Sequence, residues 1–197
     1  MPKNLAILIF PEVEVLDFCG PFEVFSVASR LTDPAAFQVF TVAERAGPVI
    51  ARNGLSVNPH FQLDDCPAPD IVLVPGGQGT RTEMHNERLI KWIKGRAATA
   101  ELMLSVCTGA LLLARAGLLE GLEATTHHGA IELLREVAPN TTVRSNCRYV
   151  DNGRVVCSAG IAAGIDMSLH ITARLAGAEI AAKTAEQMEY PWAGRAK

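Results

Sequence analysis

One cysteine of the sequence stands in a pattern that could make it a nucleophile. Cys107 follows the apolar run Leu102–Val106 and precedes the helix-favouring stretch Gly109–Ala116. The residues two positions before and after it, Ser105 and Gly109, are both small. This pattern predicts a nucleophile elbow, a strained strand-to-helix turn whose flanking segments approach closely. The alternative interpretation is a buried structural cysteine at the end of a strand.

An elbow would place the Cys107 thiol at the start of the following helix. The first N–H groups of a helix lack intrahelical partners, and their partial positive charge favours a thiolate. We therefore expect the N–H of Thr108 to bind negative charge that develops on a substrate. A second N–H is expected from Gly76 or Gly77, although their Pro-Gly-Gly sequence is also that of an ordinary turn.

A nucleophilic thiol needs a neighbouring acid or base, and the sequence offers several. Asp17 lies where the loop after the first strand enters a helix, although the helix dipole also favours a carboxylate there. His127 and His128 follow a short expected strand, and either one could pair with Cys107 or be a bystander. The nearby alternatives to Asp17 are Glu12, Glu14 and Glu23. No second cluster of Asp, Glu or His has metal-ligand spacing, so we expect no metal.

The elements that would hold these residues alternate between apolar strands and helices. The expected strands are Leu5–Phe10, Phe37–Ala43, Ile71–Val74, Leu102–Val106, Thr141–Val150 and Arg154–Cys157. The expected helices are 21–31, one bounded by Gly79 and Gly95, 109–116, 163–175 and 178–188. Continuous apolar strands are typical of parallel sheets that are covered on both faces. The sequence therefore predicts an α/β fold, a mostly parallel sheet with helices on both sides.

In such sheets, ligands bind outside the carboxyl ends of the strands. Four segments of this sequence follow strand ends, namely 17–20, 75–77, 107–109 and 158–161. We expect them to meet at one edge of the sheet. Away from this edge, the dipeptide Asn53-Gly54 within 48–59 predicts a hairpin, because both residues tolerate the positive φ of a tight turn.

The composition argues against several other classes of protein. The 197 residues are 49% hydrophobic and carry a net charge of −3, without the basic surplus that attracts nucleic acid or anionic membranes. The five cysteines include no Cys-x-x-Cys pair, and no targeting segment is visible. We therefore expect one cytoplasmic domain over residues 1–197, with a small-molecule substrate and neither a nucleic-acid nor a membrane partner.

Several motifs together carry a resemblance to a known family. They are Leu16-Asp-Phe-Cys-Gly-Pro-Phe-Glu-Val-Phe25, Val74-Pro-Gly-Gly77, Ser105-Val-Cys-Thr-Gly109, Ala124-Thr-Thr-His127 and Ala159-Gly-Ile-Ala-Ala-Gly-Ile-Asp166. With them the chain resembles the ThiJ/PfpI superfamily, which is related to the class I glutamine amidotransferases. The resemblance covers nearly the whole chain. It implies a flavodoxin-like, three-layer α/β/α sandwich with a nucleophile elbow.

Within that superfamily the pattern resembles the isocyanide (isonitrile) hydratases. The resemblance assigns roles to matching positions: Cys107 as nucleophile, Asp17 as acid–base group, Thr108 in the site, the Ile161 N–H against the sulfur and Gly77 in the oxyanion loop. It also implies a cofactor-independent lyase and a homodimer. The hydratase pattern has a tryptophan after Thr-Thr-His, where this chain has His128, so a wall of the pocket is changed.

Two other hypotheses stay open. Relatives with amidase/protease or glyoxalase/deglycase activity commonly carry glutamate in place of Asp17, and such a reaction would give His127 or His128 a role. The chain could instead be a non-enzymatic sensor of a small molecule or of oxidative stress, because an elbow cysteine is easily oxidised. Regulators of the superfamily share parts of these motifs but continue into a helix-turn-helix domain. This sequence stops at Lys197, so we expect no DNA-binding module.

Overall fold

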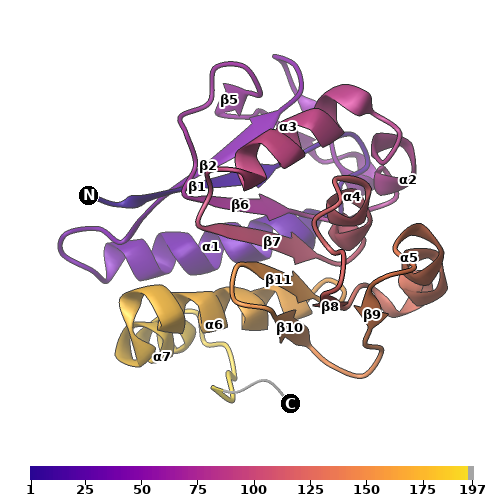
Figure 1. Cartoon of the computed structure of the whole chain (residues 1–197). Helices are drawn as coiled ribbons and strands as arrows, with labels where there is room; N and C mark the ends of the chain where they lie inside the picture. Colours follow the sequence, from indigo (N-terminus) through magenta and orange to yellow (C-terminus); the bar gives the residue numbers. More distant parts are fainter. Residues whose placement is uncertain (195–197) are drawn as a thin grey trace.

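The computed structural model describes residues 1–194, and its centre is a seven-stranded sheet with the order β10-β11-β7-β6-β1-β2-β5 (Figure 1). Its strands are β1 (Lys3–Leu8), β2 (Phe37–Ala43), β5 (Phe61–Gln62), β6 (Ile71–Val74), β7 (Leu102–Val106), β10 (Tyr149–Asp151) and β11 (Val155–Ser158). Neighbouring strands run parallel except β10 and β11, which form an antiparallel pair at one edge. The mostly parallel sheet predicted from the apolar runs is therefore confirmed.

Helices cover both faces of this sheet (Figure 1). One layer holds α1 (Val15–Arg30), α6 (Ala163–Ala176) and α7 (Ala178–Gln187), which pack against one another. The other layer holds α2 (Thr80–Glu83), α3 (Glu87–Ala97) and α4 (Gly109–Arg115), with α5 (Ile131–Val137) packed beside α4. This arrangement confirms the three-layer α/β/α sandwich that the family resemblance implied.

Two smaller pairs of strands lie outside the main sheet. The strands β3 (Val49–Ile50) and β4 (Ser56–Val57) form an antiparallel hairpin around the short helix η1 (Arg52–Gly54). Asn53 and Gly54 have φ angles of 61° and 85° there, as the Asn-Gly dipeptide predicts. The second pair is parallel, with β8 (Glu123–Ala124) beside β9 (Thr142–Val143), and the short helix η2 (His128–Ala130) follows β8.

The middle strands form the core and determine where the site lies. All side chains of β6 and β7 are buried, as are Leu5–Leu8 of β1. Because both faces of these strands pack against helices, their apolar surface is removed from water, which is the main favourable term in folding. The parallel direction of β1, β6 and β7 sends the segments that follow them to the same edge of the sheet.

Three elements differ from the prediction made from the sequence. Helix α1 begins at Val15, not at Pro21 as expected. Pro21 lies inside the helix, which continues through it because proline removes only one hydrogen bond, the one to the Asp17 carbonyl. The helix expected between Gly79 and Gly95 is two helices, since Asn86 caps α3 by accepting the N–H of Leu89. The strand expected over 141–150 is split into β9 and β10, which pair with different partners.

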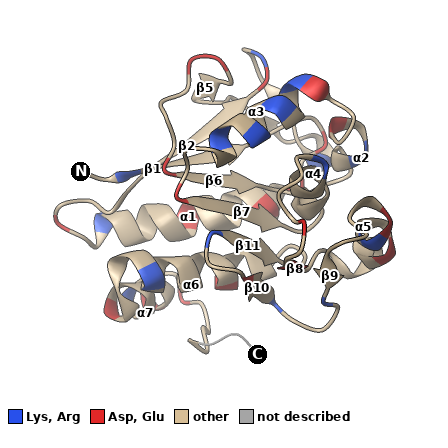
Figure 2. Ribbon diagram, viewed as in Figure 1, with Lys and Arg blue, Asp and Glu red and all other residues tan. Residues whose placement is uncertain are grey.

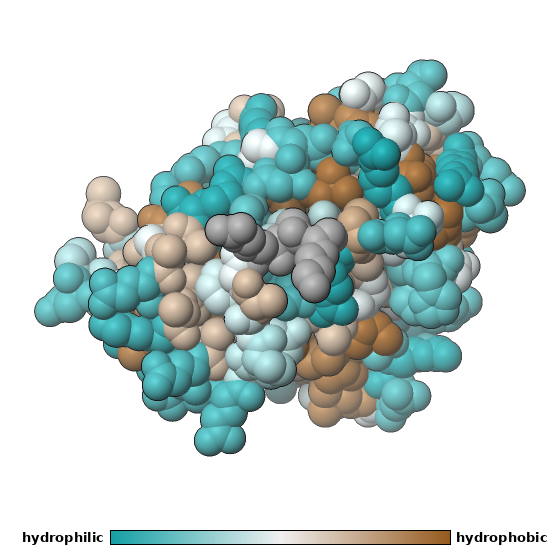
Figure 3. Space-filling model, turned by 90° about the horizontal axis from the view of Figure 1, so that it is seen from below, coloured by the Kyte–Doolittle hydropathy of each residue, from teal (hydrophilic) through white to brown (hydrophobic). Residues whose placement is uncertain are grey.

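Charged residues and a few exposed apolar residues are distributed over many elements of the fold. Figure 2 shows acidic and basic residues spread over most elements, with several basic residues along α3. Seen from below, apolar patches lie between hydrophilic side chains (Figure 3). The exposed large apolar residues are Met1, Leu16, Leu31, Ile50, Leu55 and Ile161. No helix within residues 1–194 combines the length and the apolar character that crossing a membrane requires.

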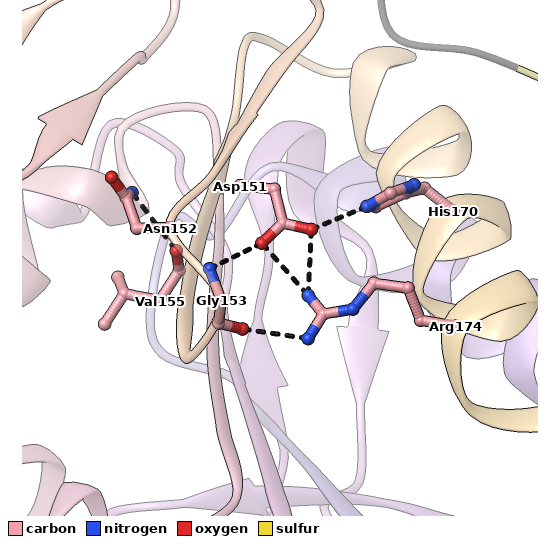
Figure 4. Close-up of polar contacts among 6 residues, drawn as sticks. All are labelled: Asp151, Asn152, Gly153, Val155, His170 and Arg174. Atoms are coloured by element: carbon pink, nitrogen blue, oxygen red, sulfur yellow. Dashed lines mark hydrogen bonds and ion pairs between the residues drawn. The ribbon is translucent and has the colours of Figure 1, made fainter.

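A polar cluster ties the β10–β11 hairpin to α6 (Figure 4). Nη1 of Arg174 donates to both carboxylate oxygens of Asp151 at 3.0 and 2.9 Å, and Nη2 donates to the Gly153 carbonyl at 3.0 Å. On the same carboxylate, Nε2 of His170 lies 2.7 Å from Oδ2 of Asp151. The cluster therefore links the turn that precedes β11 to the C-terminal half of α6.

Candidate active site

The turn at Cys107 has the backbone geometry of a nucleophile elbow. Cys107 lies between β7 and α4 with a φ of 57°, in the left-handed region that L residues rarely adopt. Its N–H is shared between the carbonyls of Ser158 and Ala159, at 3.2 and 3.1 Å. Its own carbonyl accepts the Thr126 hydroxyl at 2.8 Å. These bonds hold the strained residue in place, and the residue itself is only 5% exposed.

Close packing around the turn explains the small residues in the sequence motifs. A Cβ atom on Gly109 would lie 2.0 Å from the carbonyl oxygen of Val74, and one on Gly76 would lie 2.5 Å from the Thr108 nitrogen. Both clashes are with backbone atoms, which no rotamer change can relieve. The end of β6 and the start of α4 therefore approach this closely only because both positions are glycine.

Replacing Gly109 by alanine is expected to lower the free energy of unfolding by roughly 3 kcal/mol, because the end of β6 must shift. The matched control is Gly95→Ala in α3, where a Cβ would meet no atom within 4 Å. That variant is expected to gain about 0.5–1 kcal/mol, because alanine favours a helix interior over glycine. Denaturant unfolding measures both variants, and equal stabilities would contradict the close approach at Gly109.

Asp17 is fully buried, in the first turn of α1. Its Oδ2 accepts the N–H of Gly76 at 3.0 Å, whereas Oδ1 makes no hydrogen bond of ordinary geometry among the described residues. Burial disfavours the charged carboxylate and raises the pKa of Asp17 to about 7, against the lowering effect of the Gly76 N–H and the nearby Cys107 thiol. A carboxyl group with this pKa can give or take a proton near neutral pH.

Burial also raises the pKa of the Cys107 thiol, to about 12, and the negative charge of Asp17 acts in the same direction. The backbone N–H groups of Thr108 and Ile161 hydrogen-bond to the sulfur and lower this pKa, by less than burial raises it. The thiolate expected from the helix start is therefore not the resting form. Desolvation outweighs the dipole of a short helix, and the thiol keeps its proton until a base removes it.

The amides of Gly76 and Gly77, one of which is expected to face a substrate, both have partners within the protein. The N–H of Gly76 donates to Asp17, and the N–H of Gly77 donates to the Thr108 hydroxyl at 2.9 Å. That hydroxyl also donates to the Gly77 carbonyl at 3.1 Å. The glycines thus position the carboxyl group and the elbow. The N–H groups that point at the sulfur are instead those of Thr108 and Ile161.

The segment after β11 closes the other side of the site. Ile161 has a φ of 51°, a second strained position that directs its N–H toward the Cys107 sulfur. A Cβ atom on Gly160 would lie 2.3 Å from Cδ2 of His127, so the histidine ring packs directly on this backbone. The four segments that follow strand ends in the sequence therefore do meet, through Asp17, Gly77, Cys107 and Ile161.

The two histidines have different positions. His127 is half-buried, and its Nδ1 accepts the N–H of Gly129 at 3.1 Å. Burial lowers the pKa of His127, and the charges of His128 and Arg81 act in the same direction. His128 is exposed, and its ring packs on that of His127 at a centroid distance of 4.1 Å. Within residues 1–194, no hydrogen bond joins either ring to the Cys107 sulfur.

A small pocket of about 180 Å³ opens over the sulfur, lined by Glu14, Arg52, Gly77, Gln78, Arg81, Cys107, Thr108, His127 and Ile161. The sequence analysis missed Arg52, Gln78 and Arg81. Gln78 and Arg81 follow the Gly76-Gly77 turn, which was the available signal, whereas Arg52 comes from the β3–β4 hairpin and nothing local marked it. A larger hollow of about 460 Å³ between β2 and the β3–β4 hairpin has no cysteine, histidine or hydroxyl side chain in its lining.

The site residues all lie within a segment that matches a known family. The profile of the DJ-1/PfpI family matches residues 3–174. The chain belongs to the DJ-1/PfpI family. This match confirms the resemblance inferred from the motifs, because the motif positions from Leu16 to Asp166 all fall within it. Cys107 and Asp17 of this DJ-1/PfpI protein are thus in a segment whose fold is shared with its relatives.

Relatives of this DJ-1/PfpI chain include an enzyme and a regulator. Isonitrile hydratase from Pseudomonas putida is 36% identical over 190 residues, which cover 96% of this chain and 79% of that protein. The HTH-type transcriptional regulator GbdR from Pseudomonas aeruginosa is 28% identical over 189 residues, which cover 96% of this chain and 51% of the regulator. The chain thus spans about half the length of that relative.

Solved structures confirm the fold of the DJ-1/PfpI chain. A ThiJ/PfpI family protein from Pseudomonas syringae superposes with a TM-score of 0.88 at 27% identity, covering 97% of this chain and 76% of that one. Because the relatives include both an isonitrile hydratase and an HTH-type transcriptional regulator, family membership determines the fold but not the reaction. The reaction has to be argued from the residues around Cys107.

Proposed function

We propose that this protein is a cofactor-independent enzyme that adds water to an isocyanide and releases an N-substituted formamide. One observation above all supports the proposal: the buried carboxyl group of Asp17, with a pKa of about 7, interacts directly with the Cys107 thiol. Hydration of an isocyanide expels no amine, so it needs one acid–base group rather than a Cys–His pair. The 36% identity to isonitrile hydratase agrees with this reaction.

The first step forms a bond between sulfur and carbon. Ionised Asp17 takes the proton of the Cys107 thiol as the sulfur attacks the terminal carbon of the isocyanide. The same carboxyl group then gives that proton to the carbon, which gains an electron pair in the attack. The product is a thioimidate with the carbon held between Cys107 sulfur and the substrate nitrogen, and Asp17 is ionised again.

The second step consumes water and restores the thiol. Asp17 takes a proton from a water molecule whose oxygen adds to the thioimidate carbon, and it gives this proton to the nitrogen. The carbon–sulfur bond then breaks, and the sulfur leaves with its electron pair, facing the N–H groups of Thr108 and Ile161. Asp17 takes the proton of the new hydroxyl group as the formamide carbonyl forms, and it returns that proton to the Cys107 sulfur. In sum, one isocyanide and one water give one formamide, and no oxidant or reductant is needed.

The direct test is incubation of the purified protein with a simple isocyanide and detection of the formamide by NMR. We expect turnover without any added metal or cofactor. Assays with an amide substrate and with methylglyoxal serve as comparisons, because amidase or glyoxalase chemistry on the same elbow would consume those compounds. Turnover of either one in the absence of isocyanide hydration would refute the proposal.

The proposal also predicts a pH dependence. Since Asp17 must be ionised to accept the thiol proton and has a pKa of about 7, kcat/KM is expected to rise with pH. The midpoint should lie near pH 7, with a plateau above it, because the pKa of Cys107 is far higher. The measurement is kcat/KM between pH 5 and 9, and a profile that falls across this range would contradict the role of Asp17.

A second candidate function is sensing without turnover, favoured by the match of 96% of the chain to a transcriptional regulator. A sensor would bind an isocyanide or be oxidised at Cys107 without releasing product. Intact mass measured after incubation separates the two functions, because a sensor keeps its adduct while an enzyme returns to its original mass. Formamide in excess of the protein would exclude sensing as the sole role.

We also propose that the chain acts as a single cytoplasmic domain and as a homodimer. Two exposed apolar residues, Leu16 and Ile161, support an association surface. Light scattering after size-exclusion chromatography measures the mass in solution. A mass that matches one chain at assay concentration would refute the dimer.

A further inference from the structure

The pocket over Cys107 is more polar than an unsubstituted hydrocarbon isocyanide requires. Its wall carries two guanidinium groups, Arg52 and Arg81, one carboxylate, Glu14, and the imidazole of His127. Pockets that bind small molecules are lined mainly by apolar side chains, and the few polar groups determine which substrate is accepted. At about 180 Å³ this pocket also favours a small molecule, so its polar groups lie close to any substrate bound there.

Arg81 is a positive group of the pocket that uses only part of its N–H donors within the described residues. Its Nη1 donates to the Gly77 carbonyl and to the Thr80 hydroxyl, both at 3.2 Å, which anchors one end of the guanidinium to the loop beside the elbow. In the described residues its Nε and Nη2 have no protein acceptor, and it forms no salt bridge. A guanidinium with free N–H groups on one edge matches the two oxygens of a carboxylate.

The other charges of the pocket are arranged differently. Nη1 of Arg52 donates to a carboxylate oxygen of Glu12 at 2.8 Å, so a protein carboxylate already balances this charge. Glu14 lines the pocket and, among residues 1–194, takes part in no salt bridge. Arg81 and His127 both line the pocket, and the charge of Arg81 contributes to the lowered pKa of the His127 ring.

We propose that Arg81 makes this site select a small substrate that carries a carboxylate close to its reacting carbon. This inference rests on the proposed function, which supplies the isocyanide as the reacting group of the substrate. The second group of the substrate is a carboxylate, which Nε and Nη2 of Arg81 would bind. The simplest molecule of this class is isocyanoacetate, whose methyl ester has the same isocyanide without the charge. Glu14, as a negative charge in the same pocket, opposes the anion, so its removal strengthens the preference.

The test compares the acid and its ester in the same enzyme. We expect kcat/KM for isocyanoacetate to exceed that for methyl isocyanoacetate, and the ratio to fall about tenfold in Arg81→Gln, as loss of one charge-assisted contact predicts. If the substitution only disturbed the loop, kcat/KM would fall equally for both substrates and their ratio would stay unchanged. In Glu14→Gln the ratio should rise.

Arg52→Gln is the matched control, because it removes an arginine of the same pocket that is already paired with Glu12. Its effect on the ratio should be smaller than that of Arg81→Gln. An equal or larger effect would overturn the assignment to Arg81, since general positive charge would then explain the preference. Equal turnover of acid and ester by the unmodified protein would overturn the inference while leaving isocyanide hydration intact.

A binding measurement separates failure of this inference from failure of the proposed function. The corresponding hydration product, N-formylglycine, and its methyl ester can be titrated into Cys107→Ala by calorimetry. The acid is expected to bind about tenfold more tightly than the ester, and Arg81→Gln in the same background should abolish the difference. Equal binding overturns the inference whatever the turnover assay shows. A preference for the acid without any hydration of isocyanides supports the anion site and refutes the reaction.

Discussion

Replacement of Cys107 by alanine is expected to abolish formamide formation, with a loss in kcat on the order of 10⁴-fold. The sulfur forms the bond to the substrate carbon. The other hydroxyl or thiol in the described pocket lining is that of Thr108, which is hydrogen-bonded to the backbone of Gly77. The fold should be unaffected, because alanine lacks only the sulfur atom. Product formation followed by NMR, with circular dichroism to check folding, measures both expectations.

Cys147→Ala is the matched control for loss of a thiol. Cys147 is a free, half-buried cysteine outside the pocket lining, and its replacement should leave turnover within about twofold, as expected of a surface substitution away from the site. The unmodified protein, quenched during turnover, should also show one added substrate mass on the peptide that contains Cys107. Substantial hydration by Cys107→Ala would show that the reaction does not pass through this sulfur.

Asp17→Asn is expected to lower kcat by 10²- to 10⁴-fold, the range typical of a lost acid–base group. The amide can still accept the N–H of Gly76, as Oδ2 of the carboxylate does at 3.0 Å, so the loop should keep its place. What disappears is the proton carrier between the thiol and the substrate carbon. Unchanged kcat in this variant would exclude Asp17 from the reaction.

The same substitution is expected to stabilise the protein, by about 4 kcal/mol at pH 8. The folded-state pKa of Asp17 is about 7, above its ordinary value of 3.8, so the folded state holds the proton more tightly than the unfolded state. Stability from this group is therefore present at low pH and is lost as pH rises through about 7. Asparagine carries no charge to desolvate and escapes that loss.

Urea unfolding of the wild type and of Asp17→Asn at pH 4 and pH 8 measures this effect. The two proteins should differ clearly at pH 8, and the gain should shrink at pH 4, where the folded wild type holds Asp17 protonated. A variant that is less stable than wild type at both pH values would contradict the burial of an uncompensated carboxylate. Loss of activity together with a gain in stability would mark Asp17 as a residue kept for chemistry.

The sequence was most informative where one physical requirement determined the residue type. Continuous apolar runs predicted β6 and β7 because strands buried on both faces have no polar side. Small residues around Cys107 predicted the elbow because larger ones would clash with the end of β6. Asp17 was a candidate because strand ends of a parallel sheet share an edge, and its carboxyl group indeed bonds to Gly76 from another strand end.

Features that depend on three-dimensional surroundings were not accessible in this way. The raised pKa of Cys107 follows from burial and from the charge of Asp17, 90 positions earlier, which outweigh the local helix start that the sequence displays. Arg52 reaches the pocket from the hairpin predicted over 48–59, whose place beside the pocket nothing in the sequence indicated. The sequence predicts that Gly76 or Gly77 offers an N–H to a substrate, because it could not show that Asp17 and Thr108 accept the hydrogen bonds of these two amides.

The meeting of Asp17, Gly77, Cys107 and Ile161 at one edge has a consequence for how the protein folds. These residues span most of the chain, and the strands between them pair in parallel, so every connection at the site is a distant one along the sequence. Such pairings form late and together, because the entropy of closing each long loop is lost before its contacts contribute any favourable free energy. Catalysis should therefore emerge in a single kinetic phase with the complete sheet, and recovery of turnover during refolding should follow the slowest structural signal.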